Sequence, residues 1–440
     1  MSERVDAIVV GARCAGSAAA IALARAGPRV VALDRVAFPA DTISTHLIWP
    51  GGVAELKALG ALGRVQALGA PPLPRALAGA GELEIRGDYT PVDGIDYALC
   101  VRRPGLDAAL AETARAAGAE VRERCTVTAV VHAAGRVAGV RYRDDDGTEH
   151  ELRAPLVVGA DGRRSTVARL VGALRPYRER ASGRACFFAY WEDGRDEWRA
   201  TAAQWRTGAE LGTAFPCDHG LALVLLQPPE ARAGDFRADL AGEYARTVRS
   251  IPALAERLEG CRQATKVRAA TAIASYFRRS SGRGWALAGD AGHFKDPVTA
   301  QGIRDALRYG RRLGEVAAPL LENATALDRA LRLWERERER DCLEIYQWTN
   351  LLARGEPMSP LEVELYREAQ DDPLLARRMA DVFSRSARPA DVLTLRRSAR
   401  LATRALRRRR GDRAATLAAS GRDFSTAIAD WRERLSVGRA

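Results

Sequence analysis

The chain has 440 residues, of which 47% are hydrophobic and 28% are charged. A chain of this length is too long for one hydrophobic core, so two or three domains are expected. The composition excludes a disordered chain and a collagen-like chain. The seven cysteines include no CxxC pair, which argues against a zinc knuckle or a dithiol redox site, and no metal site is predicted.

The formal net charge is +12, and the basic excess is densest between Arg396 and Arg413. Leucines recur at roughly helical spacing in this segment, so we interpret it as the solvated face of an amphipathic helix. No aromatic side chain interrupts the arginines, which disfavours nucleic acid as a partner. Contact with a membrane surface stays open as an alternative.

No signal-peptide pattern precedes the first apolar run, and no apolar run is long enough to cross a bilayer. We therefore expect a cytoplasmic protein without a transmembrane segment. The sequence does not specify an oligomeric state.

The first 35 residues alternate between strand and helix patterns. Residues 5–11 form an apolar run, an alanine-rich helical stretch closes at Gly27, and a second apolar run ends at Asp34. This order predicts a parallel βαβ unit of a Rossmann-like α/β fold.

The turn between the first strand and its helix, from Gly11 to Gly16, reads GARCAG. It keeps the first and third glycines of the dinucleotide-binding pattern G-x-G-x-x-G and has Arg13 at the second position. Such glycines permit a sharp turn and close helix packing, and the helix N-terminus then faces phosphates. Asp34 is placed to accept hydrogen bonds from a ribose. A plain strand-turn-helix connection would fit the same residues.

Helices are expected over about 50–68 and 103–117, and an antiparallel meander over 125–158. A second motif, VVGADGRRS, ends an apolar strand and places Ser165 to cap a helix. Aromatic residues and strand patterns between about 181 and 279 predict a second, sheet-containing domain. The third motif, GDAGHFKDPVTAQGI, runs from Gly289 to Ile303, and the chain is mostly helical in pattern beyond Gly302.

The three motifs, in this order and spacing, resemble those of the flavoprotein monooxygenases of the para-hydroxybenzoate hydroxylase type. The stretch RRPGLDAAL, which contains Arg103, resembles the flavin-contacting arginine of that family ahead of its helix. The likeness covers roughly residues 5–315. It implies an FAD-binding domain over 1–175 and 280–320, a substrate-binding sheet domain over 176–279, and a helical region over 321–440.

The resemblance further implies FAD as cofactor and NADH or NADPH as its electron donor. In that family the reduced flavin adds molecular oxygen to form a C4a-hydroperoxide, which oxygenates a small, electron-rich, often aromatic substrate of degradation or secondary metabolism. The residue matching Asp290 meets the ribityl chain, and the helix near Gly302 points its positive N-terminus at the flavin. The implied FAD contacts are Gly11, Arg13, Cys14, Ala15, Gly16, Asp34, Arg35, Arg103, Asp161, Asp290, Pro297, Gln301, Gly302 and Ile303.

Two histidines are candidates for a catalytic role. His46 follows the second strand in a loop that approaches the flavin or the substrate in the resembling family, and a hydrogen-bonded loop histidine is its alternative. His293 lies inside the third motif, where it could set local charge or contact the substrate.

Three other functions remain as alternatives. A prenyl-chain reductase of the geranylgeranyl reductase type would use the same FAD site to saturate a double bond in a long apolar groove. A flavin-dependent halogenase is disfavoured, because its Trp-x-Trp-x-Ile-Pro stretch is absent and Lys57 lies in an amphipathic helix. A non-catalytic flavin-binding module would use the basic C-terminal region as its docking surface.

Overall fold

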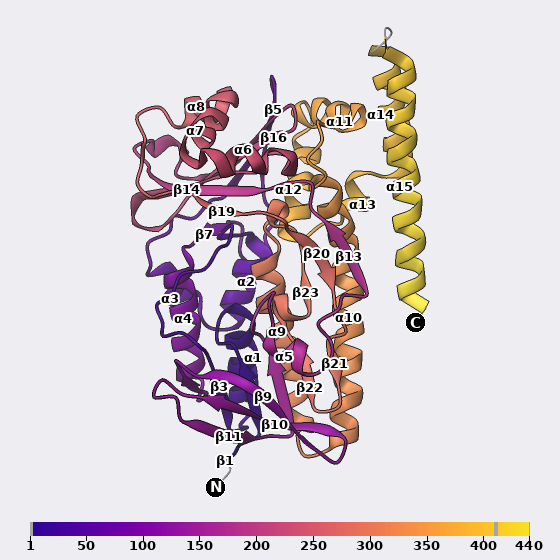
Figure 1. The fold of residues 1–440 in the computed structure, drawn as a ribbon. Coiled ribbons are helices and arrows are strands. Elements are labelled where there is room, and N and C mark those ends of the chain that lie inside the picture. The colour runs from indigo at the N-terminus through magenta and orange to yellow at the C-terminus, as the bar shows by residue number, and fades with distance from the viewer. Residues whose placement is uncertain (1–2, 409–411, 440) are drawn as a thin grey trace.

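The structure is a computed structural model that describes residues 3–408 and 412–439. Figure 1 shows one end of the molecule built around the N-terminal strands, the opposite end built around a second sheet, and the C-terminal helices along one side. The α/β fold class predicted from the sequence is confirmed, including the helical C-terminal region.

A mainly parallel six-stranded sheet in the order β21-β22-β12-β2-β3-β8 carries the N-terminal unit. Its strands are β2 (Ala7–Val10), β3 (Val30–Leu33), β8 (Glu120–Arg122), β12 (Leu156–Gly159), β21 (Ser281–Gly282) and β22 (Trp285–Leu287). The central strands are buried at every position, as expected for a parallel sheet that is covered on both faces.

Helices cover one face of this sheet, and an antiparallel meander covers the other. The helices are α1 (Cys14–Arg25), α4 (Arg103–Ala116) and α9 (Gly302–Ala317), with α2 (Pro50–Ala58) and α3 (Leu62–Gln66) beside them. The meander contains β9 (Thr126–Ala133), β10 (Arg136–Arg143) and β11 (Glu149–Arg153), joined by β1 (Glu3–Arg4), and α5 (Thr166–Leu170) packs nearby. The meander and the helix at 103–117 lie where the sequence predicted them. The helix expected over 50–68 is divided into α2 and α3.

The second sheet has eight strands, in the order β18-β14-β17-β16-β15-β5-β6, with β19 also paired to β14. They are β5 (Arg75–Ala80), β6 (Leu83–Asp88), β14 (Cys186–Glu192), β15 (Thr201–Thr207), β16 (Glu210–Pro216), β17 (Leu221–Leu226), β18 (Arg262–Gln263) and β19 (Arg268–Ala270). One face packs on α6 (Ala233–Ala238), α7 (Leu240–Ser250) and α8 (Pro252–Arg257). The other face is directed toward β4 and α12.

The sheet differs from the expected domain division in one respect. Residues 75–88 were placed in the first domain, yet β5 and β6 extend the second sheet, because β5 pairs in parallel with β15 from Thr201 to Arg206. A parallel pairing between strands so far apart in the chain leaves no local pattern in the sequence.

Two small sheets join the units. One contains β13 (Arg178–Ala181), β20 (Ala274–Phe277) and β23 (His293–Phe294), and the other contains β4 (Leu47–Ile48) and β7 (Leu99–Cys100). The C-terminal helices are α10 (Ala324–Leu352), α11 (Pro360–Gln370), α12 (Pro373–Ser384), α13 (Pro389–Val392), α14 (Leu395–Arg408) and α15 (Arg413–Arg439).

The basic segment 396–413 contains most of α14 and the start of α15, and its residues 409–411 lie outside the described part. Helical structure there agrees with the amphipathic interpretation. Among the described residues, no helix combines the length and the apolar character needed to cross a membrane.

Candidate FAD site

The glycine-rich turn connects β2 to α1, and both of its glycines are required by close backbone contacts. A Cβ atom added to Gly11, whose φ is +95°, would lie 2.5 Å from the carbonyl oxygen of Ala160. A Cβ atom added to Gly16 would lie 1.7 Å from the carbonyl oxygen of Gly11. The two glycines therefore allow the turn to pack on the end of β12 and α1 to pack on the turn.

Arg13 points toward α4. Its Nη1 donates to the carbonyl of Ala40 at 3.1 Å and to the carboxylate of Asp107 at 2.6 Å. Arg103 also pairs with Asp107 at 2.8 Å, and the Cys14 thiol lies 3.4 Å from the same carboxylate. Asp107 is fully buried, so one carboxylate joins the glycine-rich turn to α4. Sequence analysis missed Asp107, although its position four residues after Arg103 on a helix is a signal for an ion pair.

Asp34 ends β3 beside the glycine-rich turn. One carboxylate oxygen accepts a hydrogen bond from the backbone of Ala12 at 2.7 Å, and the other accepts from Val36 at 3.1 Å. The neighbouring Arg35 is exposed. The structure thus places Asp34 at the end of the strand, as predicted, and its contact with a ribose stays a prediction.

The third motif leads from β22 to α9 through two short turns, η4 (Gly289–Ala291) and η5 (Pro297–Thr299). Asp296 caps η5 by accepting from the backbone of Val298 at 2.9 Å, and Ala300 adopts a left-handed conformation with φ of 51°. A Cβ atom added to Gly289 would lie 2.7 Å from the Cβ of Ala15, so the first and third motifs touch. The helix α9 then begins at Gly302.

The segment that leads into α9 borders open space and contains a hydrogen-bond acceptor that has no partner among the described residues. A side chain added at Gly302 would meet no atom within 4 Å. Gln301 donates from Nε2 to the carbonyl oxygens of Thr299 and Phe383, and its Oε1 is buried without a partner among the described residues. Ile303 is buried against the core of the first unit.

Asp290 lies in η4, among several cationic side chains. Burial raises the pKa of its carboxyl group, while the charges of Arg163 and Arg103 oppose that increase. The Tyr276 hydroxyl donates to the backbone carbonyl of Asp290 at 2.6 Å and fixes the turn. Arg103 pairs with Asp107, and the charge of Asp290 contributes to raising the pKa of Arg103.

The carboxylate of Asp161 holds the start of α5 in place. Its carboxylate accepts from the Ser165 hydroxyl at 2.5 Å and from the backbone of Thr166 and Val167 at 2.6 and 3.1 Å. Ser165 in turn caps α5 through the backbone of Ala168, as its sequence position predicted. The predicted contact of Asp161 with FAD is untested, and the carboxylate in this structure holds the start of α5.

His46 is fully buried and adopts a left-handed conformation with φ of 62°. Its Nε2 is hydrogen-bonded to the Tyr190 hydroxyl on β14, and its Nδ1 has no partner among the described residues. Burial, followed by the charge of Arg103, lowers the pKa of His46 to about 3, so the imidazole is neutral. Burial raises the pKa of Tyr190 well above its ordinary range, which keeps its hydroxyl protonated.

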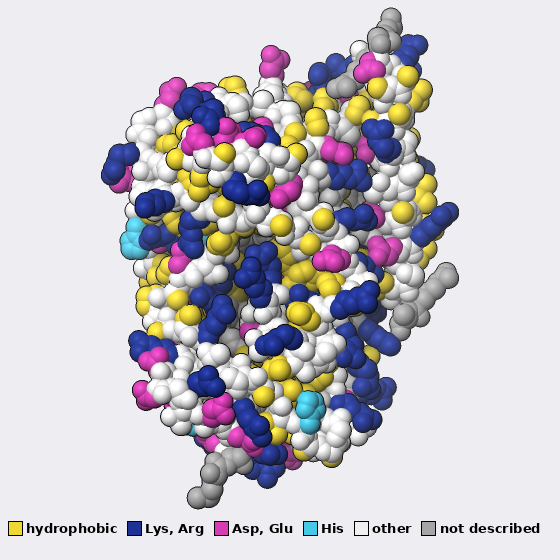
Figure 2. Space-filling view, in the orientation of Figure 1, with side chains coloured by type: hydrophobic (Ala, Val, Ile, Leu, Met, Phe, Trp, Pro, Cys, Tyr) yellow, Lys and Arg dark blue, Asp and Glu magenta, His cyan; other side chains and the backbone are white. Residues whose placement is uncertain are grey.

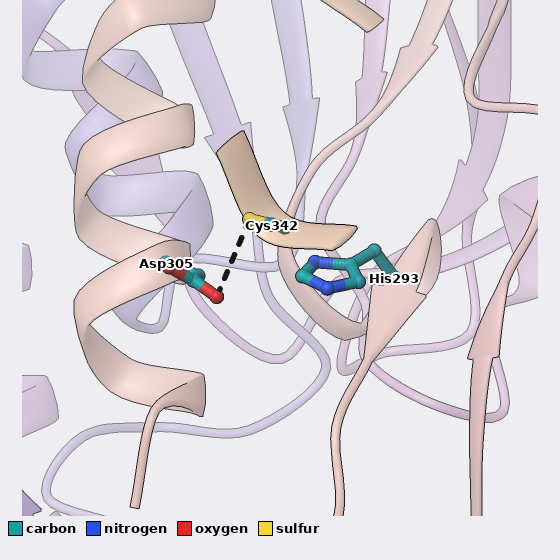
Figure 3. Close-up of side chains that lie close together, drawn as sticks. All are labelled: His293, Asp305 and Cys342. Carbon is teal, nitrogen blue, oxygen red and sulfur yellow. Dashed lines mark hydrogen bonds between the residues drawn. The ribbon is translucent and has the colours of Figure 1, made fainter. Parts of the chain in front are cut away.

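His293 belongs to a buried charged cluster between β23, α9 and α10. Figure 3 shows His293, Asp305 and Cys342 converging from these elements. Their ligand atoms are close enough to hold a metal ion, but Lys295 Nζ is 3.0 Å from His293 Nε2 and also pairs with Asp305. Burial and then the Lys295 charge lower the pKa of His293 well below its ordinary value. Its predicted catalytic role stays a prediction.

An apolar cavity of about 120 Å³ lies beside the third motif, residues 289–303, and includes Val298 in its wall. It is enclosed by β5, β6, β15 and β16 on one side and by α10, α11 and α12 on the other. Its wall includes Trp49, Phe215, Val298, Trp348, Met379 and Phe383. The Trp49 indole donates to the carbonyl of Thr299 at 2.9 Å, so the wall of the cavity is bonded directly to the segment before α9.

Comparison with known proteins identifies the family of the chain. Residues 4–348 match the family model described as FAD binding domain. The chain belongs to this FAD-binding family. It is therefore an FAD-dependent oxidoreductase, and the predicted membership of the para-hydroxybenzoate hydroxylase-like superfamily is confirmed.

Two relatives and one solved structure illustrate the proteins to which this chain is similar. The chain is 30% identical over 352 residues to digeranylgeranylglycerophospholipid reductase 2 of Methanopyrus kandleri, covering 76% of this chain and 82% of that relative. It is 30% identical over 357 residues to a menaquinone reductase of Mycobacterium tuberculosis, covering 76% and 79%. The solved structure of the myxobacterial chondrochloren halogenase CndH matches with a TM-score of 0.72 and 22% identity, covering 87% of this chain and 97% of that one. The likeness to CndH, at 22% identity, shows a shared fold and nothing about function.

The residues present fit FAD. Five other helices have a side chain that caps their first turn, from Ser165, Asp239, Asn323, Ser359 and Asp372. The helices α1 and α9 have no side-chain cap, as is also true of α2, α3, α4, α6 and α8, but α1 and α9 begin at the two motifs that touch each other. Free backbone N–H groups at a helix N-terminus bind anionic groups, such as a pyrophosphate or an electron-rich flavin edge.

Proposed function

We propose that the protein uses FAD to reduce a carbon–carbon double bond in an apolar, prenyl-type chain. The observation that carries this proposal is the apolar cavity between the second sheet and helices α10 to α12. Its wall is built mainly from aliphatic and aromatic side chains, and Val298 brings it to the third motif. Such a cavity favours a hydrocarbon substrate, because a polar molecule would lose its hydrogen bonds to water on entering it.

The relatives support the same choice. Two relatives that are 30% identical over most of the chain are named as reductases of a geranylgeranyl lipid and of menaquinone. Both compounds are prenyl lipids. The prenyl-chain reductase, considered above as an alternative to the monooxygenase, is thereby favoured for this chain.

Saturation of a double bond requires a hydride equivalent and a proton. Bound FAD would supply the hydride equivalent, with NADH or NADPH as the proposed source of electrons. We assign the proton to the Tyr190 hydroxyl, which is hydrogen-bonded to the neutral His46. Tyr190 does not line the apolar cavity, but it belongs to the same apolar cluster as the wall residues Trp49 and Phe215. The uncapped start of α9 would stabilise negative charge on the reduced cofactor.

Monooxygenation with molecular oxygen is the second candidate. The rings of His46, Phe188 and Tyr190 form a cluster with centroids 5.7 to 6.0 Å apart, a surface suited to an aromatic substrate. Halogenation has less support. Lys57, the early lysine of the chain, is exposed and donates to the carbonyl of Asp93 at 2.8 Å on the surface.

One anaerobic experiment separates these functions. The FAD-loaded protein is reduced with one equivalent of dithionite without oxygen and mixed with geranylgeraniol, and the flavin absorbance and the product mass are followed. The proposal expects reoxidation of the flavin with a mass gain of two hydrogens. No reoxidation without oxygen, together with an oxygenated product in air, would reject the reductase and establish the monooxygenase.

A further inference from the structure

The C-terminal helix α15 lies along one side of the molecule (Figure 1). Arg434 donates to the side-chain oxygen of Gln347 at 2.6 Å, and the Gln347 amide donates to Glu433 at 2.7 Å. Glu433 also pairs with Arg178 at 2.7 Å. The helix is thus attached to α10 and β13 by hydrogen bonds and ion pairs.

Large apolar side chains of α15 are exposed. The exposed fractions are 57% for Leu417, 46% for Ile428, 54% for Trp431 and 41% for Leu435. Nine large hydrophobic side chains are exposed in the described part of the chain, and these four belong to one helix. Successive members of this set are 11, three and four residues apart, which is close to a whole number of helical turns in each case. The four side chains therefore form one stripe along the helix. Figure 2 shows hydrophobic side chains along the edge that α15 occupies in Figure 1. This arrangement reverses the usual one, in which the apolar stripe of a helix is buried.

Basic groups accompany the stripe. Arg413, Arg422 and Arg432 are exposed on α15, whereas Asp430 and Glu433 are half-buried on its inner side. The accessible face therefore combines apolar side chains with positive charge. Helices with this combination bind at the surface of bilayers that contain anionic lipids.

We propose that the outer face of α15 docks the protein on the surface of an anionic lipid bilayer. The charge complementarity of the arginines with anionic headgroups supports this occupant, while a second copy of the chain would bring like charges together.

A second cavity lies between α15 and the body of the molecule and shares wall residues with the apolar cavity. It has a volume of about 200 Å³, and Phe424 and Ala427 of α15 contribute to its wall. Trp348, Leu351 and Leu393 line both this cavity and the apolar cavity beside the third motif. The wall of the second cavity also contains charged side chains, such as Glu344, Arg354 and Asp430, so its lining is mixed and not apolar. The docking of α15 does not depend on the proposed function.

Docking is tested by sedimentation of the FAD-loaded full chain with vesicles. The vesicles contain either phosphatidylcholine alone or phosphatidylcholine with 30% phosphatidylglycerol. We expect binding to the anionic vesicles at least tenfold tighter than to the neutral ones. The double variant Ile428→Ser/Trp431→Ser should lose at least tenfold of this binding, and Arg422→Gln/Arg432→Gln should lose the preference for anionic lipid.

Matched controls come from the outer face of α10, where Leu333, Arg329 and Arg332 are exposed. Leu333→Ser and Arg329→Gln/Arg332→Gln should bind vesicles as the unmodified chain does. All substituted residues are exposed, so their thermal unfolding is expected to be unchanged. Analytical ultracentrifugation of the same variants measures the oligomeric state.

Either of two results would overturn the proposal. One is equal sedimentation of the α15 variants and the α10 controls with anionic vesicles. The other is a dimer that the Ile428→Ser/Trp431→Ser variant dissociates, which would assign the face to a second copy. Vesicle binding requires no turnover, so failure of the prenyl-reductase assay would leave this test and its outcome unaffected.

Discussion

Asp107 offers a direct test of how the glycine-rich turn is held in place. The substitution Asp107→Ala removes a fully buried carboxylate and leaves Arg13 and Arg103 without their shared partner. The side chain of Arg103 is 12% exposed and that of Arg13 is 24% exposed. Both guanidinium groups would therefore keep their charge with little access to water.

The expected magnitude follows from this burial. Removing one partner of a buried ion pair costs about 3–5 kcal/mol of folding free energy. We expect a value near the lower end, about 3 kcal/mol, because Arg13 can move partly into solvent. Asp107→Asn should cost less than Asp107→Ala, because the amide oxygen still accepts a hydrogen bond from one arginine.

The assay is urea unfolding of the FAD-free protein, followed by circular dichroism. Glu112→Ala on the same helix is the matched control, because Glu112 is 58% exposed in its pair with Arg115. Exposed ion pairs contribute less than about 1 kcal/mol. An equal, small loss of stability in the Asp107 and Glu112 variants would refute the view that Asp107 anchors the turn.

Four further predictions test the site. Gly302→Val should leave thermal unfolding of the FAD-free protein unchanged and abolish FAD retention after gel filtration, since the added side chain enters open space before α9; retained FAD would remove the flavin from that position. Asp290→Ala should preserve the fold and weaken FAD binding at least tenfold in a fluorescence titration, and an unchanged affinity would reject its ribityl contact. Val298→Phe should slow turnover of a long prenyl substrate at least tenfold while FAD reduction by NADPH is unaffected, because the larger ring fills the apolar cavity; equal turnover would place the substrate elsewhere. His46 and His293 have folded-state pKa values below those of the unfolded chain, so stability should fall as the pH decreases below about 6.5, by at most ~1.4 kcal/mol per pH unit for each histidine. The His46→Gln/His293→Gln variant should show a smaller decrease in melting temperature between pH 7.5 and 5.5, and an identical pH dependence would contradict the assignment.

Local features of the site were predictable from the sequence. Gly11 and Gly16 define the turn, because steric contacts of the backbone with nearby residues decide where a Cβ atom fits. Ser165 caps α5 three residues further along the chain, which is again a short-range interaction. The three motifs and their order were sufficient to predict the Rossmann-like fold and FAD as the cofactor.

Other features arise from contacts between distant segments. Asp107 and Arg13 are 94 positions apart, and the Tyr190 hydroxyl meets His46 across 144 positions. The residue types at these positions are compatible with many partners, and only the packing of α1 on α4 and of the second sheet on β4 selects the pairs. The same applies to β5, whose addition to the second sheet depends on β15.

By itself, the sequence determined which segments form helices, strands and glycine-rich turns, since these depend on steric and hydrogen-bonding preferences of neighbouring residues. The tertiary structure decided which faces of those segments are buried. The apolar stripe of α15 would be read as a buried face from its sequence, yet ion pairs and hydrogen bonds of its polar residues with the body turn that stripe outward. The apolar cavity is likewise a product of the packing, because its wall combines strands from residues 75–88 and 201–216 with helices from residues 324–384.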